Sequence, residues 1–598
     1  MKATKTALLL LICAALLSTF FIACKPSESG GDNSGQPSGS SSPPPSVIVP
    51  QTPDESIPPV EELELITIEW LGTGTSYLLD GAFPEDRVIK ALEERTKVRI
   101  DWGINVGLTD VNSRIMMMLS SGTLPDIVMP VSSAEVGRRL VEAGAVYQLD
   151  DLVAKYGHNI IENAGKMLAY NKLTKSDDTN ALYCLSVDVG NSTLGDLAID
   201  ASWSLRWDLY KQLGYPPINS YDDFLNVLKD MLALEPENAD GRKNYAFGLF
   251  LAEDWGHQMI DRAMMFEQGK NGLNVCQVNT VDLTIEPRLN DPDGVFWQSM
   301  EFWNKAYSMG LLDTESATLK YQTYIDKMST NRYLAAGNSW MVAGSHNNLY
   351  RDSGGEKGFM PIMIDPNPDG VYFISELQVG SLSSAYISKN CKYPERVMML
   401  FDYLATSEAY ELLLNGVQGT DWDYDENGIP VLIGETRQQA YDGAIDPTLT
   451  GIGKYSWQLG LIKPGYNLEK GYFTRYMTNT HYDEGPPSLY TDYYDFYNIT
   501  HLQENFIKFP KFTYDYGFNS IVVAEPNTEY DYIDIDIQSY LLTDILKLVF
   551  AASPEEFQAG KTKCIEHINS LGAEKLVDYY SQKWNDFHGQ LNAMSQFN

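Results

Sequence analysis

The feature that most restricts the fold of this 598-residue chain is an alternation of strand and helix patterns between residues 63 and 129. Residues 63–71 alternate apolar and polar side chains as a strand does, residues 84–97 carry an amphipathic helical stripe, and residues 98–102 return to a strand pattern. A second helical stripe at 110–121 leads into a short apolar strand at 125–129. Strands that alternate with helices in this way pair in parallel, so the pattern predicts an α/β fold with a parallel sheet.

Other helices are predicted from their first residues. Ser220 and Asp223 form a capping box before an apolar run, and Pro394 opens a second apolar helix. The segments 540–550, 554–571 and 574–587 indicate successive helices near the end of the chain. Residues 441–500 hold 10 of the 37 tyrosines, and the acidic stretch 490–497 among them is interpreted as a loop whose tyrosines pack over the body.

The charge of the chain limits its partners. With 44 basic and 80 acidic side chains the net charge is −36, and removal of Lys2 and Lys5 with residues 1–23 would make it 42 − 80 = −38. Such a surface disfavours nucleic acid and polyanionic ligands, uronates included, and favours a neutral substrate. The 7 histidines and 6 cysteines offer little for a metal enzyme or a disulfide framework, so no cofactor is predicted.

The N-terminus indicates export and lipid attachment. Lys2 and Lys5 precede an uncharged stretch, 7–23, that suits a signal peptide and is too short for a stable membrane span. Ala23 and Cys24 end it in a pattern that resembles a bacterial lipobox, so residues 1–23 are predicted to be removed and Cys24 to carry diacylglycerol, with palmitate among its acyl chains. Residues 24–60, rich in Ser, Gly and Pro, are then a flexible tether at the extracellular face of the cell membrane.

Motifs for catalysis or metal binding are incomplete. The triplet Asp421, Asp423 and Asp425 has the spacing of a calcium loop, but Glu426 stands where glycine is needed and Leu432 where a bidentate glutamate is needed. No catalytic residue and no metal site are therefore predicted. The four cysteines of the body are predicted to be buried single thiols: Cys184, Cys276, Cys391 and Cys564.

Several segments also carry family motifs in a fixed order. They include 118–127 (MLSSGTLPDI), 203–214 (WSLRWDLYKQLG), 306–313 (AYSMGLLD), 388–396 (SKNCKYPER) and 416–428 (GVQGTDWDYDENG). Together they resemble the extracellular solute-binding proteins (family 1) of carbohydrate ABC transporters, in the long lipoprotein branch of Gram-positive bacteria. The resemblance implies a two-lobed, periplasmic-binding-protein-like (type II) fold with a hinge and a ligand between the lobes.

The resemblance also suggests lobe boundaries. Residues 61–185 and 386–450 would form the first lobe, and residues 186–385 and 451–598 the second, with crossings near Leu182–Val187 and Ala385–Ser388. In many relatives the loop that matches 235–245 binds calcium. Here Asn244 and Tyr245 stand where acids are usual, which disfavours structural calcium but leaves it open.

Ligand contacts are expected at the carboxyl ends of strands and on the segments that match ligand-facing parts of the family. The expected contacts are Trp70, Thr73, Gly74, Met129 and Ser132 in the first lobe, Trp203, Arg206, Trp207, Trp340, Ser345, His346 and Asn347 in the second, and Trp422 and Trp457 on later loops. Sugar rings would stack on the indoles near loops, while the other tryptophans are predicted to be core: Trp102, Trp255, Trp297, Trp303 and Trp584. A core position fits Trp340 equally well.

The favoured function is a monomeric, lipid-anchored binding protein that delivers an oligosaccharide to the transmembrane subunits of an ABC permease, without chemistry. A surface polysaccharide-degrading or carbohydrate-anchoring lipoprotein is the first alternative, because 12% of the residues are aromatic and acids are abundant. A sensor that passes a ligand signal to a membrane kinase is the second. Recovery of the sugar after binding separates the favoured function from degradation.

Overall fold

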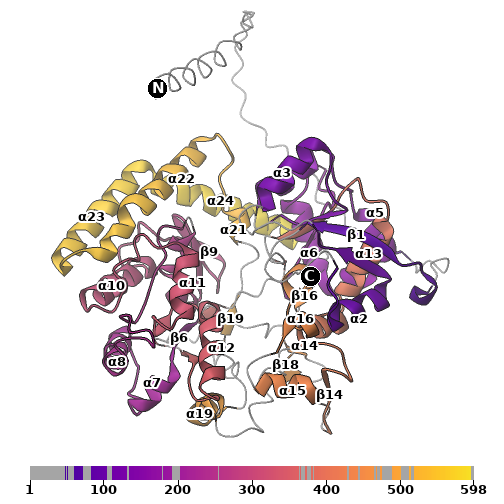
Figure 1. Ribbon diagram of the computed structural model, residues 1–598. Helices are drawn as coiled ribbons and strands as arrows, with labels where there is room; N and C mark the ends of the chain where they lie inside the picture. Colours follow the sequence, from indigo (N-terminus) through magenta and orange to yellow (C-terminus); the bar gives the residue numbers. More distant parts are fainter. Residues whose placement is uncertain are drawn as a thin grey trace, which may run out of the picture. The chain divides into compact units, whose positions relative to one another are not determined.

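The computed structural model (Figure 1) describes residues 48, 50–51, 59–71, 83–103, 111–130, 133–177, 179–190, 202–253, 255–362, 364, 371–373, 379–380, 383–426, 428, 430–441, 445–463, 466–467, 472–473, 488–499, 511–513 and 518–593. All of them belong to one compact unit, Pro44–Asn598. The predicted signal peptide, Cys24 and most of the predicted tether lie outside the described residues. Within the described part, no helix is both long enough and apolar enough to cross a bilayer.

The first sheet confirms the predicted parallel pattern. Its strands, in spatial order, are β2 (Val98–Asp101), β1 (Ile66–Leu71), β3 (Ile127–Val128), β13 (Ser384–Ile387) and β4 (Leu185–Ser186). Strands β2 and β3 pair with β1 in parallel, whereas β13 is antiparallel to both β3 and β4. The two-residue strand β5 (Val189–Gly190) pairs separately and in parallel with β16 (Ile462–Lys463).

Helices pack around this sheet to form the first lobe, which we define by the apolar clusters that contain Ile68 and Leu71. The predicted helices at 84–97, 110–121 and 394–404 are confirmed. The helical elements of this part are η1 (Val60–Glu62), α2 (Arg87–Thr96), α3 (Val111–Ser121), α4 (Ala134–Glu142), α5 (Asp150–Tyr156), α6 (His158–Thr174), α13 (Pro394–Leu404), α14 (Ser407–Asn415), α15 (Gly434–Tyr441), α16 (Pro447–Thr450) and α17 (Ser456–Leu459). A hairpin of β14 (Trp422–Tyr424) and β15 (Pro430–Leu432) follows α14.

The second lobe, defined by the clusters that contain Trp203 and Tyr333, is built on short antiparallel sheets. One sheet has the order β10 (Ala335–Ala336), β6 (Trp203–Arg206), β11 (Phe359–Ile362), and another the order β7 (Lys270–Leu273), β8 (Cys276–Asn279), β9 (Thr284–Pro287). Two further strand pairs are β12 (Val371–Phe373) with β19 (Lys511–Thr513) and β17 (Tyr466–Asn467) with β18 (Tyr472–Phe473).

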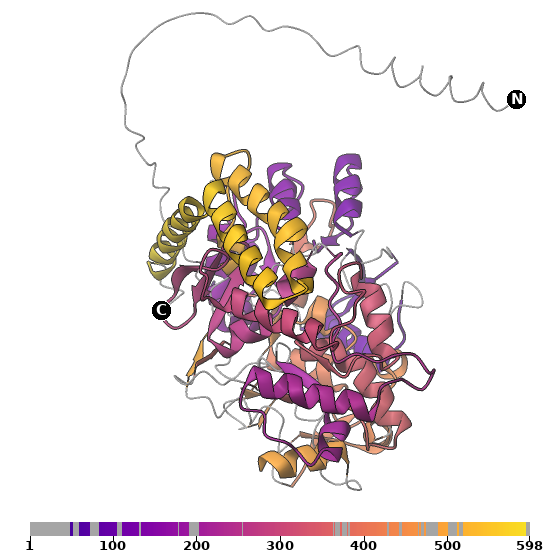
Figure 2. The ribbon, with the colours of Figure 1, turned by 90° about the vertical axis from the view of Figure 1, so that its left-hand side faces the viewer.

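The helices of the second lobe include the predicted C-terminal group. They are α7 (Trp207–Gln212), α8 (Tyr221–Leu234), η3 (Gly256–Met259), α9 (Arg262–Glu267), α10 (Val295–Ser308), α11 (Tyr321–Ser329), η4 (Ser339–Val342), α12 (Ala343–Asp352), α19 (Leu489–Tyr497), α21 (Phe518–Ile521), α22 (Glu529–Tyr540), η5 (Leu541–Ile545), η6 (Leu546–Phe550), α23 (Pro554–Leu571) and α24 (Ala573–Asn592). The Ser220 side chain accepts from the Asp223 N–H at the start of α8, as predicted. Figure 2 shows α22, α23 and α24 packed against one another, in yellow.

Segment 490–497 is a helix, so its interpretation as a loop is wrong. Ser488 caps the N-terminus of α19 by accepting from the Thr491 N–H, and Asn498 ends the helix in the left-handed conformation. Tyr490, Tyr493 and Tyr494 lie at helical spacing and are buried. The apolar surface of the tyrosine rings therefore gives this stretch the stripe of an amphipathic helix, despite its acidic residues.

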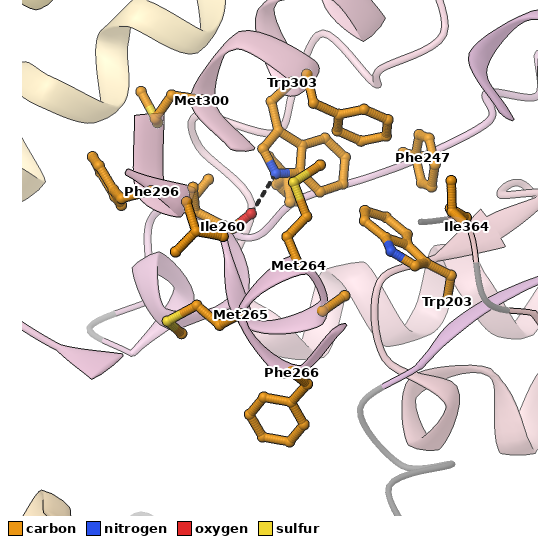
Figure 3. Packing of buried hydrophobic residues seen from close by; sticks show 14 of the residues in the cluster. Trp203, Phe247, Ile260, Met264, Met265, Phe266, Phe296, Met300, Trp303 and Ile364 are labelled. Carbon is orange, nitrogen blue, oxygen red and sulfur yellow. Dashed lines mark hydrogen bonds between the residues drawn. The ribbon is translucent and has the colours of Figure 1, made fainter. Parts of the chain in front are cut away.

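Tryptophans dominate the packing of the second lobe (Figure 3). Trp203 is only 1% exposed, and its ring centroid lies 5.2 Å from that of Phe302 and 6.0 Å from that of Trp303. The Trp303 Nε1–H donates to the Ile260 carbonyl oxygen over 2.7 Å, which satisfies the polar group of a buried ring. As predicted, Trp102, Trp297, Trp303 and Trp584 are core residues; Trp255 is half-buried.

Residues 451–463 pack with the apolar cluster of the first sheet. Tyr455 and Ile462 lie in the apolar cluster of the first lobe, although residues 451–463 were assigned to the second. The buried Asp86 carboxylate explains the placement, because it accepts from both Lys454 Nζ and the Tyr455 hydroxyl and so fixes this segment beside α2.

Candidate ligand-binding site

The carboxyl edge of the first sheet is the first candidate surface. Strands β1, β2, β3 and β4 all end there, and β13 begins there because it runs antiparallel to β3. In open α/β sheets this edge is where ligands bind. The loops after β1 and β3, which were predicted to supply Thr73, Gly74 and Ser132, start from it, but those three residues lie outside the described residues.

A polar network lies at the same edge, where β4 ends beside the start of its antiparallel neighbour β13. Lys175 Nζ donates to the Ser186 Oγ over 2.8 Å and to the Ser384 Oγ over 2.9 Å. Ser186 in turn donates to the Asn171 Oδ1 over 2.9 Å. Burial of the Lys175 ammonium lowers its pKa to about 8. The network joins the end of α6 to the neighbouring strands β4 and β13.

The edge of the β10–β6–β11 sheet is the second candidate surface. Because β6 is antiparallel to both neighbours, its start lies beside the ends of β10 and β11: Trp203 is opposite Ile362, and Ser204 is opposite Ala336. The chain reaches β6 from β5, and after β11 it passes through β12 before it reaches β13. This edge therefore lies on the side of the second lobe from which the chain runs to β5 and β13 of the first lobe. Asn338 follows the end of β10 there.

The structure places the first-lobe candidates Trp70 and Met129 in the core. Trp70 is 1% exposed and packs on Trp102 and Phe401, with ring centroids 5.6 and 6.0 Å away. Met129 is also fully buried, and its N–H donates to the Leu71 carbonyl oxygen. Both side chains face the sheet's apolar cluster in this structure, so neither presents a surface to a sugar.

Trp203, Arg206 and Trp207 are likewise enclosed. Arg206 Nη1 donates to Glu235 Oε1 over 2.9 Å, and Nε and Nη2 form a fork on the Asp208 carboxylate. The Trp207 ring packs on tyrosines of α19, and its Nε1–H donates to Asp492 Oδ2. The sequence suggested that these residues touch the ligand. In the structure they instead support the strand and helix next to the candidate edge.

The predicted contacts on η4 and α12 are close in sequence but differ in environment. Ser345 is buried and donates to Asn331 Oδ1 over 2.6 Å, whereas Asn347 is exposed. His346 Nδ1 accepts from the Phe359 N–H, so the neutral ring carries its proton on Nε2 and donates to the Tyr490 hydroxyl over 2.7 Å. Trp340 lies in η4, and its side chain is outside the described residues.

The structure describes the side chain of only one of the two remaining tryptophan candidates, Trp422 and Trp457. Trp422 is buried in a small cluster with Leu432, and its Nε1–H donates to the Gly416 carbonyl oxygen over 3.0 Å. Trp457 lies in α17, and its side chain is outside the described residues. Trp422 thus holds the β14–β15 hairpin together, while ligand contact by Trp457 stays a prediction.

The acidic segments considered as calcium loops have internal partners. Arg87 forms an ion pair with the buried Asp421, which also accepts from the Thr436 hydroxyl. Glu235 is held by Arg206, and Asn238 closes its loop by accepting from the Arg242 N–H over 2.9 Å. Among the described residues there is no group of three or more acidic, histidine or cysteine side chains arranged to hold a metal ion. The four thiols named above are buried and unpaired, as predicted.

His346 makes a pH dependence of stability testable. Its side chain is buried, and burial lowers its pKa to about 4, below the unfolded value of about 6.5. Between these pH values the unfolded chain binds a proton that the folded chain does not, so the free energy of unfolding is expected to fall as the pH drops from 6.5 to 4, by up to about 3 kcal/mol from this residue. Urea unfolding at several pH values measures it. His346→Asn, which keeps an acceptor for Phe359, should show a shallower dependence; equal slopes would contradict the assignment.

Comparison with known proteins gives matches to solved structures. No family model and no curated protein matches the sequence. An HMO-binding, ABC-transporter-associated solute-binding protein from Bifidobacterium longum infantis aligns with a TM-score of 0.53 and 15% identity, over 87% of this chain and 99% of that chain. The Streptococcus pneumoniae ABC-transporter substrate-binding protein FusA, in complex with kestose, aligns with a TM-score of 0.50 and 15% identity, over 88% and 100%.

A third similar structure is the alginate-binding protein AlgQ2 without calcium ion, with a TM-score of 0.51 and 14% identity over 87% of this chain and 98% of that chain. At such identities the likeness concerns the fold. The predicted fold class is confirmed: 87–88% of the chain shares the α/β fold of these solute-binding structures.

Proposed function

We propose that this chain, which has the fold of the ABC-transporter solute-binding proteins, captures a neutral oligosaccharide between its lobes and delivers it to the transmembrane subunits of an ABC permease without chemical change. The observation that carries the proposal is the structural likeness, over 87–88% of the chain, to proteins whose ligands are HMO and kestose. Hinge closure around the sugar is the motion that such a two-lobed receptor uses.

The geometry of the two candidate edges supports this proposal. Both edges adjoin the segments that run between the lobes, and the Lys175 network lies where β4 ends beside the start of β13. A ligand that touches both edges would favour the closed arrangement of the lobes, because it would gain contacts only when the edges approach. The net charge of −36 favours a neutral sugar over a uronate such as an alginate fragment.

A panel of purified glycans tests the proposal. Kestose, lacto-N-tetraose, an alginate tetrasaccharide and an array of other neutral oligosaccharides are each added at millimolar concentration, and the Tm is measured. A glycan present at about 100 times its Kd stabilises the folded state by about 2.7 kcal/mol, so at least one neutral glycan is expected to raise the Tm clearly. Stabilisation by the alginate fragment alone, or by no glycan, would contradict the proposal.

We further propose that the mature chain is a monomer held at the extracellular face of the cell membrane by lipid on Cys24, with residues 24–60 as its tether. The signal-like stretch before Cys24 and the Ser/Gly/Pro composition after it support this. Two acyl chains anchor a protein stably where one chain is marginal. In a producing cell, Cys24→Ala should move the protein out of the lipid-anchored membrane fraction; unchanged detergent partitioning would refute the anchor.

A further inference from the structure

Asn338 occupies a distinctive position at the second candidate edge. It follows β10 directly after Gly337 and precedes η4. The start of β6 and the end of β11 lie at the same edge, since both neighbours of β6 are antiparallel to it. Residues 191–202 connect this edge to β5, which pairs with β16 of the first lobe. Asn338 is thus at the side of the second lobe from which the chain crosses to the first.

The carboxamide of Asn338 is buried without an adequate partner. The residue is 1% exposed, and its Oδ1 accepts no hydrogen bond. Its Nδ2 lies 3.4 Å from the sulfur of Met259, which is a weak acceptor. That contact sets the orientation of the amide, because the sulfur takes the donor end and leaves the oxygen without a donor. Buried amide oxygens are nearly always satisfied in folded proteins, so this one calls for an explanation.

Through Met259, Asn338 adjoins an apolar cluster that carries two half-buried aromatic rings. Met259 and Met341 belong to one apolar cluster with Phe250, and the half-buried rings of Trp255 and Tyr321 pack against that cluster. The Trp255 and Tyr321 ring centroids are 5.0 Å apart. Partly exposed aromatic rings beside a single polar group can cover the C–H face of a pyranose and bond its hydroxyl rim.

We propose that Asn338 is a specificity-determining ligand contact whose Oδ1 accepts a hydrogen bond from a sugar hydroxyl. The proposal rests on the function proposed above and adds the chemistry of one position. An amide oxygen attracts a hydroxyl group, which can donate, and repels a carboxylate, which can only accept. At the atom that it contacts, Asn338 therefore favours a sugar hydroxyl over a carboxylate, and its unsatisfied oxygen is the cost of keeping the site ready for ligand.

The test compares Asn338→Leu with a matched control, Asn304→Leu. Asn304 is also a buried asparagine of the second lobe, but its Nδ2 donates to the Ala551 carbonyl oxygen over 2.9 Å. Kestose and lacto-N-tetraose are titrated calorimetrically into the parent and both variants, and the Tm of each free protein is recorded. Asn338→Ala repeats the measurement with a smaller side chain.

The proposal predicts that both Asn338 variants bind the glycan about tenfold or more weakly than the parent, the loss expected when a buried hydrogen bond to ligand is removed. The Tm of free Asn338→Leu should equal or exceed that of the parent, whereas Asn304→Leu should lower it. Unchanged affinity in the Asn338 variants, or a Tm loss in Asn338→Leu as large as in Asn304→Leu, would overturn the assignment while leaving the proposed function intact. A parent that binds neither these two glycans nor any other neutral glycan of the panel would contradict both.

Discussion

Trp203→Ala is expected to lower the free energy of unfolding by about 3–5 kcal/mol, the usual cost of removing a large buried aromatic side chain. The Trp203 ring is enclosed by Phe224 at 5.5 Å and by Phe302 at 5.2 Å between ring centroids, among other rings. Chemical denaturation followed by far-UV circular dichroism measures the change.

Trp203→Phe is the matched variant, because it keeps an aromatic ring in the same place and should cost clearly less. The sequence had suggested Trp203 as a stacking platform for sugar, and the two roles predict different results. A core residue changes stability in the absence of any glycan. Normal stability of Trp203→Ala together with lost glycan binding would contradict the packing role and return Trp203 to the ligand surface.

Asp86→Ala is expected to have an effect of similar size, about 3–5 kcal/mol, because it leaves the buried Lys454 ammonium without its carboxylate. The same carboxylate caps α2 by accepting from the Ile89 N–H over 3.0 Å and accepts from the Tyr455 hydroxyl. Gly451 shows how closely this region is packed, since a Cβ on it would lie 2.2 Å from Asp86 Oδ1. Denaturant unfolding of the variant gives the free-energy change.

Asp446→Ala is the control for Asp86→Ala. Asp446 also caps a helix, α16, by accepting from the Thr448 N–H, but its partners are local, and such a cap contributes about 1 kcal/mol. Equal losses in the two variants would mean that Asp86 acts only as a cap. The contacts of Asp86 with Lys454 and Tyr455 would then not be what holds residues 451–463 beside α2.

Local patterns predicted much of the first lobe. Strands β1 and β2 have a period of two residues, helices α2 and α3 have a period of 3.6, β3 is a short apolar run, and the parallel pairing follows from their order. Helix α19 was missed because its acidic residues were weighed above the spacing of its tyrosines. Tyr490, Tyr493 and Tyr494 recur at intervals of three and four, and that spacing contained the helical signal.

The candidate site was harder to predict, because burial depends on residues far apart in the sequence. All four residues of β6 are buried, so this strand has no alternation to separate an inward from an outward face. Arg206 is neutralised by Glu235, which lies on a different element and cannot be paired with it from sequence. The unsatisfied oxygen of Asn338 and the buried ammonium of Lys175 likewise become visible only when the surrounding elements are in place.

The most direct test of the proposed function is a calorimetric titration of the purified chain with the neutral glycan that raises its Tm most, followed by chromatographic recovery of that glycan. The account predicts saturable binding of one glycan per chain, with a negative heat-capacity change from buried apolar surface and with all of the glycan recovered intact. Cleavage or modification of the glycan during incubation would contradict the account and favour the degradative alternative. Absence of saturable binding would remove its central claim.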